Sequence, residues 1–152
     1  MLCLGNEIIS DDRFGPEIAR RLEATADDLR ADVIFAPVAG FQLIDLLDGR
    51  ESVLIVDTIR TQNAEPGTLH FFAAGTLTPS HHLTTSHQIS LPTALELGKQ
   101  LGADMPRFID VLAVEAQDLE TLAEALTPPV RAALDEAESL IRHWIEQHSE
   151  EN

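Results

Sequence analysis

The chain has 152 residues, of which 44% are hydrophobic and 24% are charged, a balance typical of a globular domain long enough to bury a core. Its formal net charge of -16 argues against nucleic acid and anionic membranes as partners, because both are bound through clustered Lys and Arg. No apolar run approaches the ~20 residues that cross a bilayer, and no signal peptide is recognisable, so we expect a cytoplasmic protein without membrane association. The single cysteine, Cys3, is expected to be a buried small hydrophobic residue, and a lone cysteine suits a protein in a reducing compartment.

The first stretch of the chain, residues 2–16, has the pattern of a strand, a loop and a helix start. A short apolar run ends at Gly5, and Asp11 and Asp12 follow just before an amphipathic segment. Ligands of parallel sheets gather at the carboxyl ends of strands, so this loop is a natural place for chemistry. Its two carboxylates would repel a phosphate, which indicates a site for a cation or a proton instead.

Helix capping is the simpler explanation for these two aspartates. Asp is a favoured N-cap residue, and Pro16 fits only the first turn, so regular helix should begin only slightly before it. Asp11 and Asp12 then lie at or before the cap. The pattern leaves open whether one of the two carboxylates faces a cleft.

Apolar periodicity along the rest of the chain predicts alternating helices and strands. The strongest strand signal is residues 52–58, an unbroken apolar run of the kind that is buried on both faces of a parallel sheet. Further strands are expected at 2–4, 31–38, 68–74 and 108–114, and helices at 14–26, 41–47, 91–101, 119–126 and from Pro128 through Ile145. Residues 75–90, rich in Thr, Ser, His and Pro, are expected to form a loop that is a candidate lid over the substrate.

This order of elements predicts an α/β fold, a three-layer αβα sandwich around a central sheet of about five strands. The sheet should be mostly parallel but mixed, because the turn at residues 65–67 returns one strand antiparallel. We expect one domain over residues 1–148 with an acidic tail at 149–152. The sequence favours a monomer without fixing the oligomeric state.

A second carboxylate-bearing loop should meet the first at the carboxyl edge of the sheet. Asp57 ends the buried strand, and the loop with His81, His82 and His87 precedes a helix. The simpler interpretation is a strand reaching solvent and histidines on the surface. Two carboxylates with an imidazole would suit a divalent first-row ion with open positions, although spacing does not choose among the histidines. HExxH, paired-cysteine and GxSxG motifs are absent from the sequence.

Acidic residues accumulate after Val114, and their simplest interpretation is a solvated helical face. Only Arg131 and Arg142 offset them in this part of the chain. The ten acids are Glu115, Asp118, Glu120, Glu124, Asp135, Glu136, Glu138, Glu146, Glu150 and Glu151.

Taken in order, several short motifs resemble those of the hydrogenase maturation endopeptidases, which remove a C-terminal extension from the large subunit of nickel-iron hydrogenases. The similarity runs from the first residues to about Ala116. Its motifs are Gly5-Asn6, Asp11-Asp12, Phe14-Gly15, the strand ending in Asp57, Glu65-Pro66-Gly67-Thr68-Leu69 and Ser86-His87-Gln88.

The resemblance implies a metal-binding and catalytic set of Asp12, Asp57 and His87, with Asp11 as a cap or supporting acid or base. His81 and His82 are left without a role, and the remaining histidines, His70, His143 and His148, become structural or surface residues. Members commonly carry Gly where this chain has Arg13, a cation that could lower a neighbouring carboxylate's pKa or bind substrate.

The resemblance also implies a mechanism in which the metal arrives with the substrate. Nickel already inserted in the large-subunit precursor would be recognised by the three ligands, and no organic cofactor would be needed. Whether the metal activates water or a carboxylate acts as general base is left open. Two alternatives from other classes are a non-catalytic nickel-binding or hydrogenase-assembly protein and a nucleotide-binding regulatory domain, the latter disfavoured by the acidic first loop.

Overall fold

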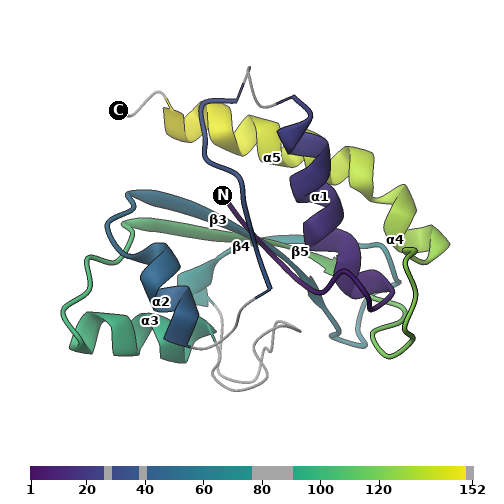
Figure 1. Cartoon of the computed structure of the whole chain (residues 1–152), viewed down its shortest axis with the longest axis horizontal. Coiled ribbons are helices and arrows are strands. Elements are labelled where there is room, and N and C mark those ends of the chain that lie inside the picture. Colours follow the sequence, from purple (N-terminus) through teal and green to yellow (C-terminus); the bar gives the residue numbers. More distant parts are fainter. Residues whose placement is uncertain (26–28, 38–40, 77–90, 150–152) are drawn as a thin grey trace.

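The computed structural model describes residues 1–25, 29–37, 41–76 and 91–149, and their centre is a five-stranded sheet in the order β2-β1-β3-β5-β4 (Figure 1). The strands are β1 (Leu2–Leu4), β2 (Ile34–Ala36), β3 (Ser52–Ile59), β4 (Leu69–Ala73) and β5 (Phe108–Glu115). Four strands run parallel, and β4 pairs antiparallel with β5 at the edge. The predicted mixed sheet with one antiparallel strand is therefore confirmed.

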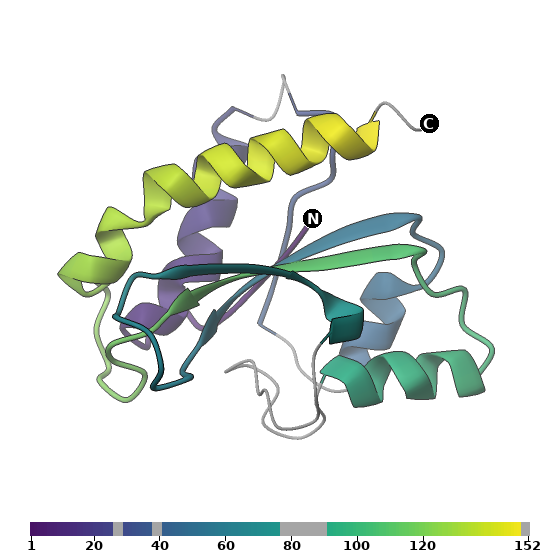
Figure 2. The same cartoon turned by 180° about the vertical axis from the view of Figure 1, so that it is seen from behind.

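Helices cover both faces of this sheet, which gives three layers. The helical elements are η1 (Asp11–Arg13), α1 (Phe14–Glu23), α2 (Phe41–Leu47), η3 (Ala74–Thr76), α3 (Leu91–Gln100), α4 (Pro128–Ala132) and α5 (Leu134–Ser149). Figures 1 and 2 show α1 and α5 over one face and α2 and α3 over the other. No helix among the described residues combines the length and the apolar character that a membrane crossing requires.

The alternation of side chains along β3 divides the interior into two cores. Leu54 and Val56 pack with residues of α1 and α5, whereas Val53, Ile55 and Ile59 pack with residues of α2 and α3. Successive residues of a strand point to opposite faces, so the part of β3 that lies within both cores, residues 53–56, is apolar at every position. Each fully buried Leu, Ile or Val contributes roughly 1.5–3 kcal/mol, which makes β3 a rigid support for the residues at its end.

A very close approach joins β1 to α1. A Cβ on Gly15 would lie 1.8 Å from the carbonyl oxygen of Leu4, and one on Gly5, whose φ is +140°, would lie 2.2 Å from that of Asp12. The Asn6 amide donates to this Asp12 carbonyl at 3.0 Å. Because only glycine tolerates such contacts, these two positions let the first loop fold back over the end of β1.

The predicted helix over residues 119–126 is wrong. This segment is an irregular loop, and it pairs with the first loop through a bridge between Ile9 and Leu122 and a hydrogen bond from the Ser10 amide to the Thr121 carbonyl at 3.0 Å. The helix predicted from Pro128 is divided at Ala133 into α4 and α5. In contrast, α1 begins at Phe14, two residues before Pro16, as predicted.

Candidate active site

Buried polar side chains gather at one edge of the sheet. Five polar or charged residues are buried in the described part of the chain, and each either follows β1 or belongs to the last residues of β3 or β5: Ser10, Asp11, Asp57, Thr58 and Glu115. Buried polar groups cost free energy unless they are hydrogen-bonded, so a fold does not collect them without a structural or functional reason. The carboxyl edge of the three central strands is therefore the candidate site.

Asp12 and Asp57 both accept a hydrogen bond from the same residue, Thr58. The Thr58 hydroxyl donates to Asp12 Oδ1 at 3.1 Å, and the Thr58 amide donates to Asp57 Oδ1 at 2.7 Å. Asp57 is fully buried, whereas Asp12 is partly exposed. The structure thus brings together two of the three residues that the sequence proposed, although they are 45 positions apart.

The two acids approach this point from opposite faces of the sheet. Thr58 shares the face of Leu54 and Val56, which is covered by α1, and there it meets Asp12 of η1. By the alternation of the strand, Asp57 shares the face that is covered by α2 and α3. That is the face to which α3 belongs, and α3 begins four residues after His87.

His87 itself, with His81, His82 and the proposed lid at 75–90, lies wholly or largely outside the described residues. Within the described ranges, no group of three His, Cys, Asp or Glu side chains is arranged to hold a metal ion. The three-residue ligand set therefore stays a prediction, of which the structure places the two carboxylates.

Asp11 fastens the loop that follows β5. Its side chain is fully buried and accepts hydrogen bonds at 2.8 Å from the amides of Gln117, Asp118 and Thr127. The Thr127 hydroxyl also donates to it, at 2.8 Å. Asp11 opens η1, whose N-cap residue Ser10 makes no side-chain capping bond. The two neighbouring aspartates therefore do different things, since Asp11 holds a loop and Asp12 faces Thr58.

The loop that Asp11 holds is further stiffened by Asp118. Asp118 Oδ1 accepts hydrogen bonds from the amides of Glu120 and Thr121, both at 3.0 Å. The Thr121 hydroxyl and these two amides favour the charged carboxylate, and they lower the pKa of Asp118 below its ordinary value. The ionised form of Asp118 is therefore the one that these hydrogen bonds in the loop favour.

Arg13, which stands where the resembling family commonly has Gly, spans the first loop. Its guanidinium donates a short hydrogen bond to the backbone carbonyl of Glu7. This contact closes the loop on itself across residues 7–13.

Sequence reasoning missed Glu115, which it placed on a solvated face. Glu115 ends β5, is 2% exposed, and accepts hydrogen bonds from the amide and hydroxyl of Thr61 at 2.7 and 2.9 Å and from the Gln62 amide at 3.1 Å. His70 Nε2 lies 3.0 Å from the same carboxylate. Gln62 has a φ of 61°, in the left-handed region, so Glu115 holds a strained turn just after β3.

Three further residues lie at this edge although the sequence did not predict them there: Thr58, Glu115 and Thr127. The available signal for Glu115 was its place at the end of the last parallel strand, the same argument that selected Asp57. Thr127 could not be selected in this way, because it ends no strand and its contact with Asp11 joins residues 116 positions apart.

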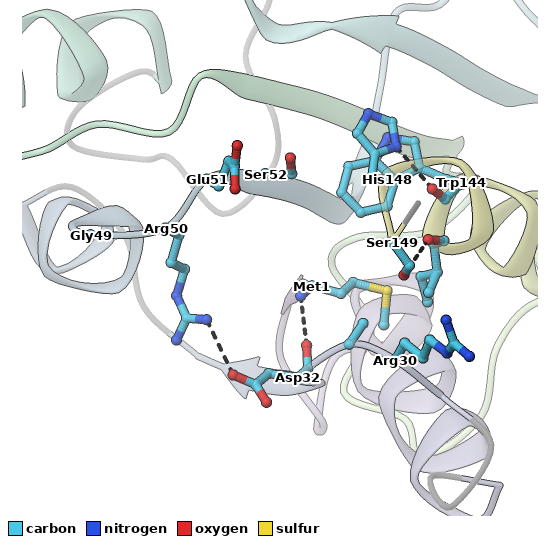
Figure 3. A pocket seen from close by; sticks show the side chains of 12 residues that line it. Met1, Arg30, Asp32, Gly49, Arg50, Glu51, Ser52, Trp144, His148 and Ser149 are labelled. Carbon is cyan, nitrogen blue, oxygen red and sulfur yellow. Dashed lines mark hydrogen bonds and ion pairs between the residues drawn. The ribbon is translucent and has the colours of Figure 1, made fainter. Parts of the chain in front are cut away.

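A cavity of about 290 Å³ lies at the opposite edge of the sheet (Figure 3). Met1 and Ser52, at the amino ends of β1 and β3, line it together with Arg50 and with Trp144 and His148 of α5. The rings of Trp144 and His148 stack with their centroids 4.1 Å apart. Because neither Asp12 nor Asp57 belongs to this cavity, it is separate from the candidate site.

Comparison with known proteins gives a family for the chain. A family model described as hydrogenase maturation protease matches residues 16–144. A relative from Methanothermobacter thermautotrophicus, named coenzyme F420 hydrogenase subunit delta, is 30% identical over 147 residues, which cover 90% of this chain and 87% of the relative.

Solved structures show the same fold. The hydrogenase maturating endopeptidase HybD from E. coli superposes with a TM-score of 0.76 at 24% identity and covers 97% of this chain and 91% of its own. The [NiFe] hydrogenase maturation protease HybD from Thermococcus kodakarensis superposes with a TM-score of 0.67 at 20% identity, covering 95% and 96%. With the family match over most of the chain, the conclusion is that this chain belongs to the hydrogenase maturation protease family and is a peptidase.

Proposed function

We propose that this protein removes the C-terminal extension of a nickel-iron hydrogenase large-subunit precursor after nickel has been inserted, and that the inserted nickel is what its site recognises. Membership of the family supports a protease role in hydrogenase maturation. The nickel requirement and the identity of the substrate are what the resemblance to this family implies, and the acids at the carboxyl edge support the nickel requirement.

The observation that carries the proposal is the link through Thr58. Thr58 donates through its hydroxyl to Asp12 of η1 and through its amide to the adjacent Asp57, so both carboxylates are positioned against one residue near the end of β3. These hydrogen bonds orient the two acids at the carboxyl edge of the sheet. The two carboxylates are therefore preorganised to complete the coordination of an ion that arrives with the substrate.

The chemistry asked of this site is hydrolysis of one peptide bond. In the proposal, Asp12 and Asp57 give oxygen ligands and His87 a nitrogen ligand to the precursor's nickel, a donor set suited to a divalent first-row ion. Binding would fix the nearby carbonyl so that water adds to its carbon, the C–N bond breaks and the amine leaves with a proton. We assign Asp11 to holding the loop, because both of its oxygens already accept hydrogen bonds.

The decisive assay uses the purified precursor with and without nickel. We expect the nickel-loaded precursor to lose its C-terminal extension, read out as a mass decrease, and the nickel-free precursor to remain intact. Equal cleavage of both forms would remove the nickel requirement. Failure to cleave any cognate precursor would remove the peptidase assignment for this substrate.

Substitutions test the residues of the site. Asp12→Ala, Asp57→Ala and His87→Ala should each slow processing at least about 100-fold, because loss of a positioning group misplaces the scissile bond. Asp45→Ala, an exposed aspartate on α2, is the matched control and should leave the rate unchanged. Thr58→Val should also slow processing while Thr58→Ser restores it, because only the hydroxyl donates to Asp12. Full activity of the Asp12 and Asp57 variants would refute the site.

A non-catalytic assembly role is the second candidate, and the relative named as a hydrogenase subunit favours it. An assembly protein would form a stable complex with the precursor and leave its mass unchanged. Size-exclusion chromatography followed by mass spectrometry of the recovered precursor separates the two functions.

A further inference from the structure

Beside the candidate site lies an exposed aliphatic patch, formed by Ile8, Ile9 and Leu122. Ile8 is 57% exposed and Leu122 is 75% exposed, whereas most large apolar side chains of the described residues are buried or partly buried. The patch joins the loop after β1 to the loop after β5, both at the carboxyl edge. Large aliphatic side chains kept in water at one place are typical of a surface that meets a partner.

The patch is held rigidly in its exposed form. Ile9 bridges Leu122, the Ala123 amide donates to the Ile8 carbonyl at 3.1 Å, and the Ser10 amide donates to the Thr121 carbonyl at 3.0 Å. The Asp11 amide adds a bond to the Asp118 carbonyl at 3.0 Å. A surface fixed in this way loses little conformational entropy when a partner binds.

Its position ties the patch to the substrate. Ile8 and Asp12 are four positions apart in the sequence, so their Cα atoms are at most about 14 Å apart, the span of about four residues of extended chain. A protein substrate whose cleaved bond reaches Asp12 therefore has Ile8 within reach of the neighbouring part of its surface.

Acidic residues flank the aliphatic ones along the chain. Glu7, which forms a long ion pair with Arg20 at 3.5 Å, precedes Ile8, and Glu120 and Glu124 flank Leu122 two positions on each side. Glu120 has 86% of its side chain exposed, and its ion pair with Arg60 is long at 3.5 Å. On a chain of net charge -16, this rim complements a basic partner rather than an acidic one.

From these contacts we infer that the patch of Ile8, Ile9 and Leu122 is the docking surface for a segment of the hydrogenase precursor that carries an aliphatic side chain next to Lys or Arg. The inference rests on the proposed function and adds to it the surface that selects the precursor. Apolar contact supplies affinity, and the acidic rim supplies the preference for a basic segment.

The test compares the double variant Ile8→Ser/Leu122→Ser with Leu101→Ser. Leu101 is 68% exposed, just after α3 and near the opposite edge of the sheet, so it controls for the loss of an exposed aliphatic side chain. With nickel-loaded precursor, we expect the double variant to raise KM about tenfold and leave kcat within about twofold, a loss typical of truncated interface residues. Leu101→Ser should match the wild type.

The charge of the rim is tested in the same assay. Glu120→Lys/Glu124→Lys should raise KM and make it less sensitive to added salt, whereas Glu146→Lys, at an exposed position on α5, should change neither. Identical KM values for all the variants and the wild type would overturn the inference.

Two outcomes distinguish failure of the patch from failure of the function. If wild-type protein does not process any precursor, the proposed function fails, and direct binding of uncleaved precursor to the wild type and the double variant still decides the role of the patch. If sedimentation velocity shows wild-type dimers that the double variant abolishes, the patch binds a second copy of this chain and the inference is overturned.

Discussion

Two adjacent aspartates, Asp11 and Asp12, have separate roles that their sequence positions do not distinguish. Asp11 is completely buried and accepts bonds from three amides and one hydroxyl, whereas Asp12 remains partly exposed beside Thr58. The first is thus a structural carboxylate that keeps the β5 loop in place. The second is the one that we propose as a ligand to the substrate's nickel.

Removing the Asp11 carboxylate should therefore destabilise the whole domain. Asp11→Ala leaves the amides of Gln117, Asp118 and Thr127 without their acceptor, and we expect the free energy of unfolding to fall by about 3 kcal/mol or more. Urea denaturation measures the change, and Asp45→Ala, at an exposed position, should stay within about 0.5 kcal/mol of the wild type. Equal stabilities of the two variants would show that the Asp11 contacts contribute little.

At the scale of elements, the junction of β1 and α1 decides where the acidic loop lies. The helix begins directly over the end of the strand because Gly15 and Gly5 have no Cβ. That close packing positions η1 between them, and η1 carries both aspartates to the edge.

The two glycines Gly15 and Gly75 provide a matched test of this junction. Gly15→Ala places a Cβ 1.8 Å from the Leu4 carbonyl oxygen, whereas a Cβ on Gly75 meets nothing within 4 Å. We expect Gly15→Ala to cost several kcal/mol through the backbone shift it forces, and Gly75→Ala to change stability by less than about 1 kcal/mol. Thermal unfolding followed by circular dichroism gives both values. A similar midpoint for the two variants would contradict the close approach.

At the scale of the whole molecule, the reactivity of Cys3 measures how well the core between the sheet and helices α1 and α5 is shielded from solvent. It lies in β1 with no exposed surface, in the core that α1 and α5 cover. Burial raises the pKa of the Cys3 thiol from 9.0 to about 12. The thiolate, which is the reactive form, is therefore suppressed in the folded protein.

Two measurements follow from the raised pKa of Cys3. At pH 8, a thiol reagent such as DTNB should label native protein only as fast as the domain opens, and should label urea-unfolded protein at once. Because the folded-state pKa exceeds the unfolded value, this contribution to stability is fully present below pH 9 and is lost as the pH rises from about 9 to about 12. Rapid stoichiometric labelling of the native protein would contradict the burial.

Local patterns were sufficient to predict most of the architecture. The apolar run of β3, the helical spacing of α1 and the position of Pro16 depend on neighbours within a few residues, and each prediction was confirmed. The parallel topology then placed Asp12 and Asp57 at one edge, because the carboxyl ends of parallel strands meet there.

The parts that the sequence did not predict depend on partners far away along the chain. The segment from Leu119 to Leu126 has helical spacing, but it pairs with the first loop more than 110 residues earlier instead. In the sequence, Glu115 resembles the surface acids that follow it, but in the structure the turn at Thr61 and Gln62 donates hydrogen bonds to its carboxylate. Composition, periodicity and motif order thus determined the fold class and named the two acids. The resemblance had already selected Asp12 over Asp11 as the metal ligand, but only the tertiary structure showed that Asp11 supports the loop after β5, because that depends on hydrogen bonds between distant segments.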